Sequence, residues 1–140
     1  MNFFLDTNIL IDFILERPKF YPAAAAIISY AVDGKVKISA SSMSIVTTNF
    51  ICVERCGMPL EIFRKKMDFL RDYLYVCSVD ESDVYHSYDA KWKDFEDGVQ
   101  YFSAKRSGAD YLVTRNVKDF EEDDLKVLGL VEACKLLQED

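Results

Sequence analysis

The chain has 140 residues, half of them apolar, which fits one domain over residues 1–140 because domains typically run to about 100–150 residues. Its formal net charge of −7 argues against a protein that wraps nucleic acid with a broad basic face, but not against an enzyme with one metal-filled crevice and a local basic rim. No apolar run approaches the ~20 residues that cross a bilayer, and Asp6, Asn8 and Asp12 interrupt the N-terminal apolar segment. We therefore expect a soluble, cytoplasmic protein with no membrane partner.

Apolar segments alternate with helical patterns along the chain. The segments predicted as strands are 2–5, 36–40, 74–79, 111–114 and 125–128. The segments predicted as helices are 9–15, 22–34, 42–56, 60–73, 82–92, 94–108 and 131–137, with Gly34 and Gly108 as stop signals. This alternation predicts an α/β fold with a parallel sheet that helices cover on both faces.

Acidic residues follow the predicted strands or open helices, where a parallel α/β sheet forms a crevice. The candidates for one shared pocket are Asp6, Glu96, Asp97 and Asp119. Because carboxylates with a pKa near ~4 repel one another at neutral pH, such a pocket needs a hard divalent cation such as Mg²⁺ or Mn²⁺. The pattern indicates metal-assisted phosphoryl chemistry.

Each acid also has a structural explanation. Asp6 can cap the helix that begins at Ile9, and acids in the first turn from Asp94 complement the helix dipole. In that helix we expect Phe95, Val99 and Phe102 to form the core stripe, which leaves Asp97 off the core face. The shared pocket is favoured only because three segments end at the same kind of sheet edge.

Basic residues form two groups. Arg64, Lys65, Lys66 and Arg71 are expected on a solvated helix face. The second group brackets the acidic residues and is the better candidate for phosphate contact; it comprises Lys105, Arg106, Arg115 and Lys118.

Three motifs resemble a known family: FLDTNILID near the start, EDGVQYFSA in the middle and VTRNVKDF after it. Over residues 1–128 the chain resembles the PIN-domain ribonucleases, which include virulence-associated protein C toxins of bacterial toxin–antitoxin pairs. The last two motifs look like a subgroup with an ED pair and a TRN-x-KDF segment. The resemblance implies a three-layer αβα sandwich with a five-stranded parallel sheet and one or two Mg²⁺ or Mn²⁺ ions.

The resemblance also assigns roles by motif position. Asp6 would be the central metal ligand and Asp97 the second, with Glu96 as a neighbouring acid. Asp119 and Asn116 would be further ligands or water-mediated contacts. The residues expected to hold carboxylates or a bound water by hydrogen bonds are Asn8 and Thr114. Arg115 or Lys118 would steady the backbone phosphate.

The chain departs from the family on the helix after the second predicted strand. The family usually has a glutamate there, whereas residues 41–53 contain no acid, and Asn49, or alternatively Thr48, stands in its place. Glu54 lies five residues beyond Asn49 and so points in another direction. We therefore expect a weaker or single-metal site.

Two functions of different class remain open. The first is a metal-dependent endoribonuclease, compatible with a toxin that an antitoxin inhibits; a homodimer is a family expectation. The second is a PIN-like domain that no longer cuts and binds RNA or a protein. A ribonuclease with two catalytic histidines is excluded because His86 is the only histidine. A haloacid-dehalogenase phosphatase is disfavoured because Asn8 stands where its second aspartate belongs.

Overall fold

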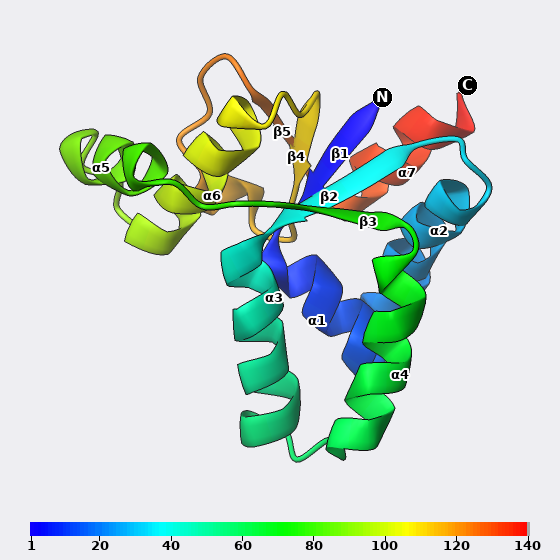
Figure 1. Cartoon of the computed structure of the whole chain (residues 1–140). Coiled ribbons are helices and arrows are strands. Elements are labelled where there is room, and N and C mark those ends of the chain that lie inside the picture. Colours follow the sequence, from blue (N-terminus) through cyan, green and yellow to red (C-terminus); the bar gives the residue numbers. More distant parts are fainter. Residues whose placement is uncertain (140) are drawn as a thin grey trace.

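The computed structural model describes residues 1–139, and its described strands form one parallel sheet in the order β3-β2-β1-β4-β5 (Figure 1). The strands are β1 (Asn2–Leu5), β2 (Lys37–Ser41), β3 (Leu74–Cys77), β4 (Tyr111–Val113) and β5 (Lys126–Leu128). In the register of the central strands, Phe4 pairs with Ser39 on one side and Leu112 on the other. The strands therefore end at a common edge.

The helices alternate with the strands as the sequence predicts. They are α1 (Thr7–Leu15), α2 (Tyr21–Val32), α3 (Ser42–Asn49), α4 (Leu60–Arg71), α5 (Glu81–Asp89), α6 (Phe95–Arg106) and α7 (Leu130–Gln138). The predicted helix 42–56 changes into a π-helix over η1 (Phe50–Arg55), and a short 3-10 helix, η2 (Val117–Asp119), was not predicted. Among residues 1–139, no helix has the length and apolar character that a membrane span requires.

Side chains of β1 alternate between two hydrophobic cores, one on each face of the sheet. Phe3 and Leu5 pack with residues of α1, α2, α4 and α7, whereas Phe4 packs with Tyr101 of α6 and with Phe120. The three-layer sandwich that the resemblance implied is thereby confirmed, with α1, α3 and α4 together on one side in Figure 1.

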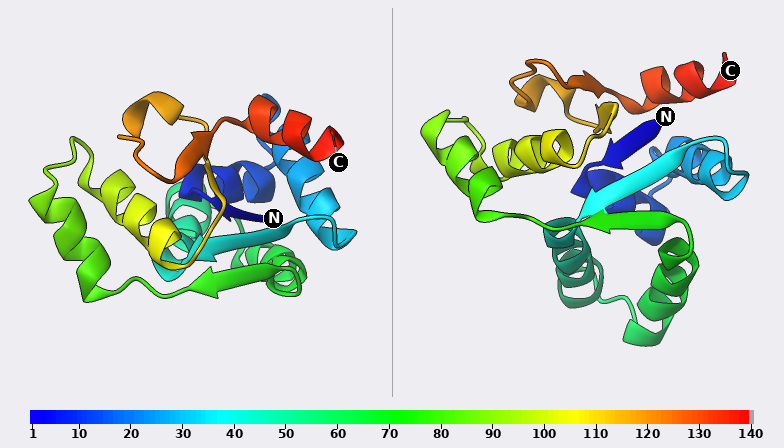
Figure 2. Two further views of the ribbon diagram at one scale, coloured as in Figure 1. Left: turned by 90° about the horizontal axis from the view of Figure 1, so that it is seen from above. Right: turned by 45° about the horizontal axis from the view of Figure 1, so that its top comes forward.

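The predicted core stripe of α6 was confirmed at Val99, which is buried, and at Phe102, which packs against the core, but it was wrong at Phe95. Phe95 is 49% exposed, whereas Tyr101 and Ala104, on the same stripe as Asp97, are buried. The reason is that α6 is covered on two sides, by the sheet and by α5, which lies beside it in both views of Figure 2. Asp97 therefore lies on the sheet-facing side of α6, in its first turn.

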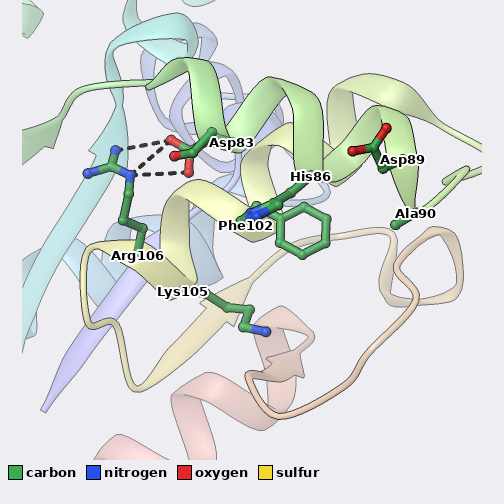
Figure 3. Close-up of a pocket in the computed structure, with 8 residues that line it drawn as sticks. Asp83, His86, Asp89, Ala90, Phe102, Lys105 and Arg106 are labelled. Carbon is green, nitrogen blue, oxygen red and sulfur yellow. Dashed lines mark hydrogen bonds and ion pairs between the residues drawn. The ribbon is translucent and has the colours of Figure 1, made fainter.

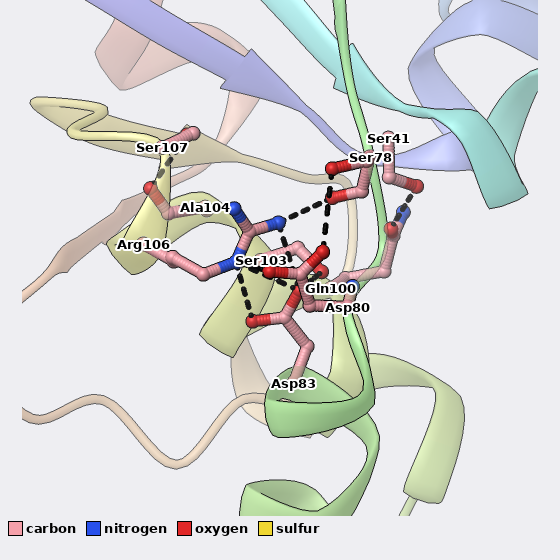
Figure 4. A network of polar contacts seen from close by, with 9 residues as sticks. All are labelled: Ser41, Ser78, Asp80, Asp83, Gln100, Ser103, Ala104, Arg106 and Ser107. Carbon is pink, nitrogen blue, oxygen red and sulfur yellow. Dashed lines mark hydrogen bonds and ion pairs between the residues drawn. The ribbon is translucent and has the colours of Figure 1, made fainter.

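Two side chains of α6, Tyr101 and Arg106, make polar contacts that fix its surroundings. The Tyr101 hydroxyl donates to Leu125 O (3.0 Å) and accepts bonds from the backbone N–H groups of Asp123 (2.8 Å) and Leu125 (3.1 Å). Arg106 bonds both oxygens of the buried Asp83 and the carbonyl of Ser78 (Figure 4). These contacts hold the chain before β5 and helix α5 against α6.

Candidate active site

Asp6 stands where β1 passes into α1. Its backbone N–H still bonds Val113 of β4 (2.9 Å), while its side chain caps α1 by accepting from the Thr7 N–H (2.8 Å). The structure therefore shows the capping role that the sequence offered as an alternative. The side chain is only 6% exposed, so this cap is buried rather than solvated.

The carboxylate of Asp6 accepts four hydrogen bonds. Oδ1 accepts from Thr7 N (2.8 Å) and Gln100 Nε2 (3.2 Å), and Oδ2 accepts from the Thr114 hydroxyl (2.8 Å) and Asn8 Nδ2 (3.3 Å). Burial raises the pKa of Asp6, and the bonds from Thr114, Gln100 and Thr7 only partly offset it. A cation that binds Asp6 must replace one of the longer bonds, and Asn8 makes the longest.

Beside Asp6 lies a buried network of neutral polar groups. Gln100 Nε2 donates to Ser44 Oγ (2.6 Å), and Gln100 Oε1 accepts from the Ser41 hydroxyl (2.6 Å), a bond drawn in Figure 4. The Thr7 and Ser44 hydroxyls are 2.7 Å apart. Sequence reasoning missed Gln100, although a glutamine one turn after Asp97 inside an apolar run was a usable signal. The network orients Asp6 without adding charge.

Asn49, which stands in place of the family glutamate, lies at the end of α3. Helix α3 contributes Ser44 to the Asp6 network, and no hydrogen bond within residues 1–139 joins Asn49 to it. Five residues along a helix turn a side chain by about 140°, so Asn49 faces away from the direction of Ser44. Thr48 lies on the Ser44 side but bonds the carbonyl of Ser44 (2.7 Å).

Asp97 carries a strongly perturbed carboxyl. Burial and the neighbouring charges, in the order Asp6, Asp94, Asp119 and Glu96, raise its pKa to about 7. Its backbone N–H bonds Asp94 Oδ1 (3.0 Å), which caps α6. Acids at the start of α1, at the start of α6 and in η2 therefore act on one carboxyl group. These are the three segments from which the sequence predicted a shared pocket.

Glu96 and Asp119 lie at the outer side of this group. Both are exposed, as is Asn116. Burial, together with the charges of Asp6 and Asp94, raises the pKa of Glu96. The Asn116 N–H bonds the Thr114 hydroxyl (3.1 Å), which links the chain after β4 to Asp6 through one side chain.

The donor set fits a hard divalent cation in chemistry. It consists of carboxylate oxygens whose mutual repulsion a cation would relieve, as the raised pKa of Asp97 indicates. Within residues 1–139, however, no three His, Cys, Asp or Glu side chains stand close enough to form a ready-made metal site. The exposed acids must therefore move toward Asp6 and Asp97 for three of them to share one ion.

The bases expected at the phosphate differ in their placement. Arg115 Nε lies 2.6 Å from Oδ2 of the buried Asp12, in an ion pair that is not aligned as a hydrogen bond, and its guanidinium stacks over Phe20. Arg17 lies 3.4 Å from the other oxygen of Asp12. Arg115 is therefore already held by Asp12, and its expected contact with phosphate stays a prediction.

Lys105 and Arg106 are also engaged. Lys105 pairs with Asp124 (2.7 Å) and Arg106 with Asp83 (3.0 Å). Lys118 differs, because it lines an open cleft of about 530 Å³ beside the acids, together with Lys91, Lys93, Asp94, Asp119 and Glu121.

A larger cavity of about 610 Å³ lies elsewhere, between α5 and α6 (Figure 3). Its buried acid is Asp83. Burial acts to raise the pKa of Asp83, but the bonds from Arg106, from the Asp80 N–H and from Ser103 outweigh it and lower the pKa. The carboxylate in this cavity is thus paired with Arg106, whereas several carboxylates lie together without a cation around Asp97.

The family model for the PIN domain matches residues 2–118. The chain belongs to the PIN domain family. A relative, ribonuclease VapC1 of Aquifex aeolicus (strain VF5), is 24% identical over an alignment of 140 positions that covers 94% of this chain and 92% of that protein.

Two solved structures share the fold. VapBC2 from Rickettsia felis, bound to a promoter DNA fragment, matches with a TM-score of 0.69 and 18% identity over 92% of this chain and 98% of that chain. Mycobacterium tuberculosis VapC20, a toxin that cleaves the sarcin–ricin loop, matches with a TM-score of 0.62 and 13% identity over 79% of this chain and 86% of that chain.

Proposed function

We propose that the chain is a single PIN-like domain over residues 1–140 that acts as a divalent-metal-dependent endoribonuclease. The observation that supports this best is the raised pKa of Asp97, to which buried Asp6 and the acids Asp94, Asp119 and Glu96 all contribute. Such a concentration of carboxylates is costly for a structural site and useful for holding a cation. The family membership supports the same activity.

Asp6 and Asp97 would hold the cation, with Asp119, Glu96 and Asn116 completing the oxygen ligands. A Mg²⁺ or Mn²⁺ ion held there would lower the pKa of a water molecule and offset charge on the phosphate. Thr114, Asn8 and Gln100 would keep the Asp6 carboxylate oriented through the bonds they make to it.

The remaining roles follow from charge and placement. Asp97 or Asp119 would orient the attacking water, so that no side chain needs to form a covalent intermediate. Lys118 lines the cleft beside these acids and would contact the RNA backbone. Because residues 41–53, which include α3, contain no acid where the family has a glutamate, we propose a weaker or single-ion site.

We also propose that the protein is a toxin with an antitoxin partner and that it works in the cytoplasm. The support is that VapBC2 of R. felis, which shares the fold, is a toxin–antitoxin complex on DNA. A partner could block the site by placing a basic side chain or a helix against the acids. A homodimer remains a proposal from the family.

A second candidate is a PIN-like domain that binds RNA or protein without cutting. The neutral Ser44–Gln100 network and the four hydrogen bonds on Asp6 favour it, because they satisfy the carboxylate without metal.

Cleavage of mixed structured and single-stranded RNAs distinguishes the two. The endoribonuclease predicts internal cuts with Mn²⁺ or Mg²⁺ that stop in EDTA and resume when metal is restored. RNA that is bound but never cut, at any metal concentration, would replace the proposed enzyme by the binding module.

A further inference from the structure

The open cleft next to the candidate active site is lined by three lysines. Lys91 and Lys93 lie between α5 and α6, and Lys118 lies in η2. Asp94 and Asp119 line the same cleft, so it is continuous with the acidic group around Asp97. The cleft thus joins a basic wall to the proposed site of cleavage.

These lysines differ from the other basic residues near the acidic group. Within residues 1–139, none of the three takes part in an ion pair, although acids adjoin two of them in the sequence. By contrast, the other bases near the acidic group are bound, as the pairs of Arg115 with Asp12, Lys105 with Asp124 and Arg106 with Asp83 show. The cleft therefore gathers cations without partners on a protein whose net charge is −7.

Both walls of the cleft are anchored in the core. Trp92, between Lys91 and Lys93, packs against Tyr101 and meets the ring of Phe120 edge to face at 5.9 Å. Phe120 is buried two residues after Lys118. The backbone N–H of Lys93 also bonds Glu121 Oε2 (3.2 Å), which ties one wall to the other. The lysines are therefore carried on a rigid frame rather than on free loops.

The backbone at Lys91 is also constrained. Lys91 follows the C-terminal cap of α5 with a φ of 54°, a left-handed conformation that is unusual for a residue other than glycine. A volume of about 530 Å³ lies within the range of ligand sites, which are about 300–1,000 Å³. The cleft has the size for a short stretch of nucleic-acid backbone, and its lining holds the three lysines beside the acids Asp94, Asp119 and Glu121.

We propose that Lys91, Lys93 and Lys118 bind the phosphates of the RNA nucleotides that flank the bond to be cut. This proposal rests on the proposed function, which makes RNA the substrate. It adds the path that the RNA strand takes from the acidic group into the cleft. Three lysine–phosphate contacts give an affinity that falls with salt, since each releases counterions. An acidic peptide of a protein partner is the competing occupant, and the test below distinguishes it from RNA.

The test uses the triple variant Lys91→Gln/Lys93→Gln/Lys118→Gln. The matched control is Lys65→Gln/Lys126→Gln/Lys135→Gln, which makes the same change of net charge at exposed positions on α4, β5 and α7. Fluorescence anisotropy measures binding of a labelled 12-nucleotide single-stranded RNA in EDTA, over a range of salt concentrations. Thermal unfolding confirms that both variants remain folded.

We expect the cleft variant to bind RNA at least tenfold more weakly and to lower the slope of log affinity against log salt by about 2, at roughly 0.7 per phosphate contact. The control should stay within twofold of wild type. With Mn²⁺, the cleft variant should raise KM while kcat stays within threefold. Equal RNA binding by the two triple variants would overturn the proposal, as would loss of poly-glutamate binding without loss of RNA binding.

The two proposals can fail separately. If wild-type protein cuts no RNA but the cleft variant alone loses RNA binding, the cleft assignment holds and the enzyme does not. If wild type cuts RNA and the cleft variant binds and cuts it as wild type does, the enzyme holds and the cleft assignment is wrong.

Discussion

The hydroxyl of Thr114 donates a 2.8 Å hydrogen bond to Oδ2 of Asp6, across 108 positions of sequence. The two residues follow β4 and β1, which are parallel neighbours in the sheet. The same hydroxyl accepts from Asn8 Nδ2 (3.3 Å) and from the Asn116 N–H (3.1 Å). One side chain thus joins the proposed central ligand to the segment that carries Asp119.

Thr114→Val removes this hydroxyl at nearly constant shape. We expect metal affinity to fall about 10–100-fold, as for other groups that orient a ligand. Stability should fall by about 1–2 kcal/mol because buried polar groups lose a partner. Calorimetric titration with Mn²⁺ and denaturant unfolding measure the two effects. Thr114→Ser keeps the hydroxyl, so equal losses in both variants would contradict the proposed role.

Asp97→Asn should stabilise the metal-free protein at alkaline pH. The folded pKa of about 7 exceeds the ordinary value of 3.8, so the folded state holds an extra proton between these values. This contribution to stability is complete below about pH 4 and is lost as the pH rises through about 7. Solvent screening at a half-buried group reduces the effect, so we expect a gain in Tm of about 2–4 °C at pH 8.

Thermal unfolding in EDTA at pH 4 and pH 8 tests this expectation. The two proteins should unfold at similar temperatures at pH 4, and Mn²⁺ at pH 8 should stabilise wild type only. A wild-type protein that matches Asp97→Asn at both pH values would show that Asp97 has no raised pKa.

Gly98→Ala should destabilise the contact between α5 and α6. A Cβ at this position would lie 2.0 Å from Ser87 Oγ and 2.9 Å from Trp92 Cγ, closer than real Cβ contacts come. We expect a loss of about 1–3 kcal/mol, measured by denaturant unfolding. Gly34→Ala is no control, since Gly34 has a φ of 74°. Ser103→Ala, which removes a bond to Asp83 without crowding, is the better comparison, and an equal loss there would argue against crowding.

Arg115→Met should leave the buried Asp12 with only the more distant Arg17. Burial already raises the pKa of Asp12 despite both arginines. Breaking a buried pair typically costs about 3–5 kcal/mol, and we expect the lower end because Arg17 remains. Adding Asp12→Asn should recover part of that loss in urea unfolding. Additive losses in the double variant would mean that the two side chains are not coupled.

The sequence predicted the succession of strands and helices along the chain, because periodicity and turn residues are local signals. It also grouped Asp6, Asp97 and Asp119, since parallel strands end at one edge, and the charges of Asp6 and Asp119 do raise the pKa of Asp97. Their joint role at a metal stays a prediction. The subgroup suggested by the last two motifs was not tested and stays a prediction.

Other features depended on tertiary contacts that periodicity cannot show. Phe95 was expected in the core, but α6 packs on two sides and buries Tyr101 instead. Arg115 looked free for phosphate, yet Asp12, which the sequence left as an ordinary acid, holds it. Ser44 was overlooked because hydroxyls carry no charge pattern, and only the folded chain brings it to Gln100.

The most direct test of the account is the ratio kcat/KM for RNA cleavage with Mn²⁺ in wild type, Asp97→Asn and Asp68→Asn. Asp68 is exposed on α4, so its substitution changes charge equally without touching the site. We predict at least a 100-fold loss for Asp97→Asn, since removing one transition-state charge contact costs about 10²–10³-fold, and no more than a twofold change for Asp68→Asn. An Asp97→Asn variant that cleaves RNA at the wild-type rate would contradict the carboxylate site.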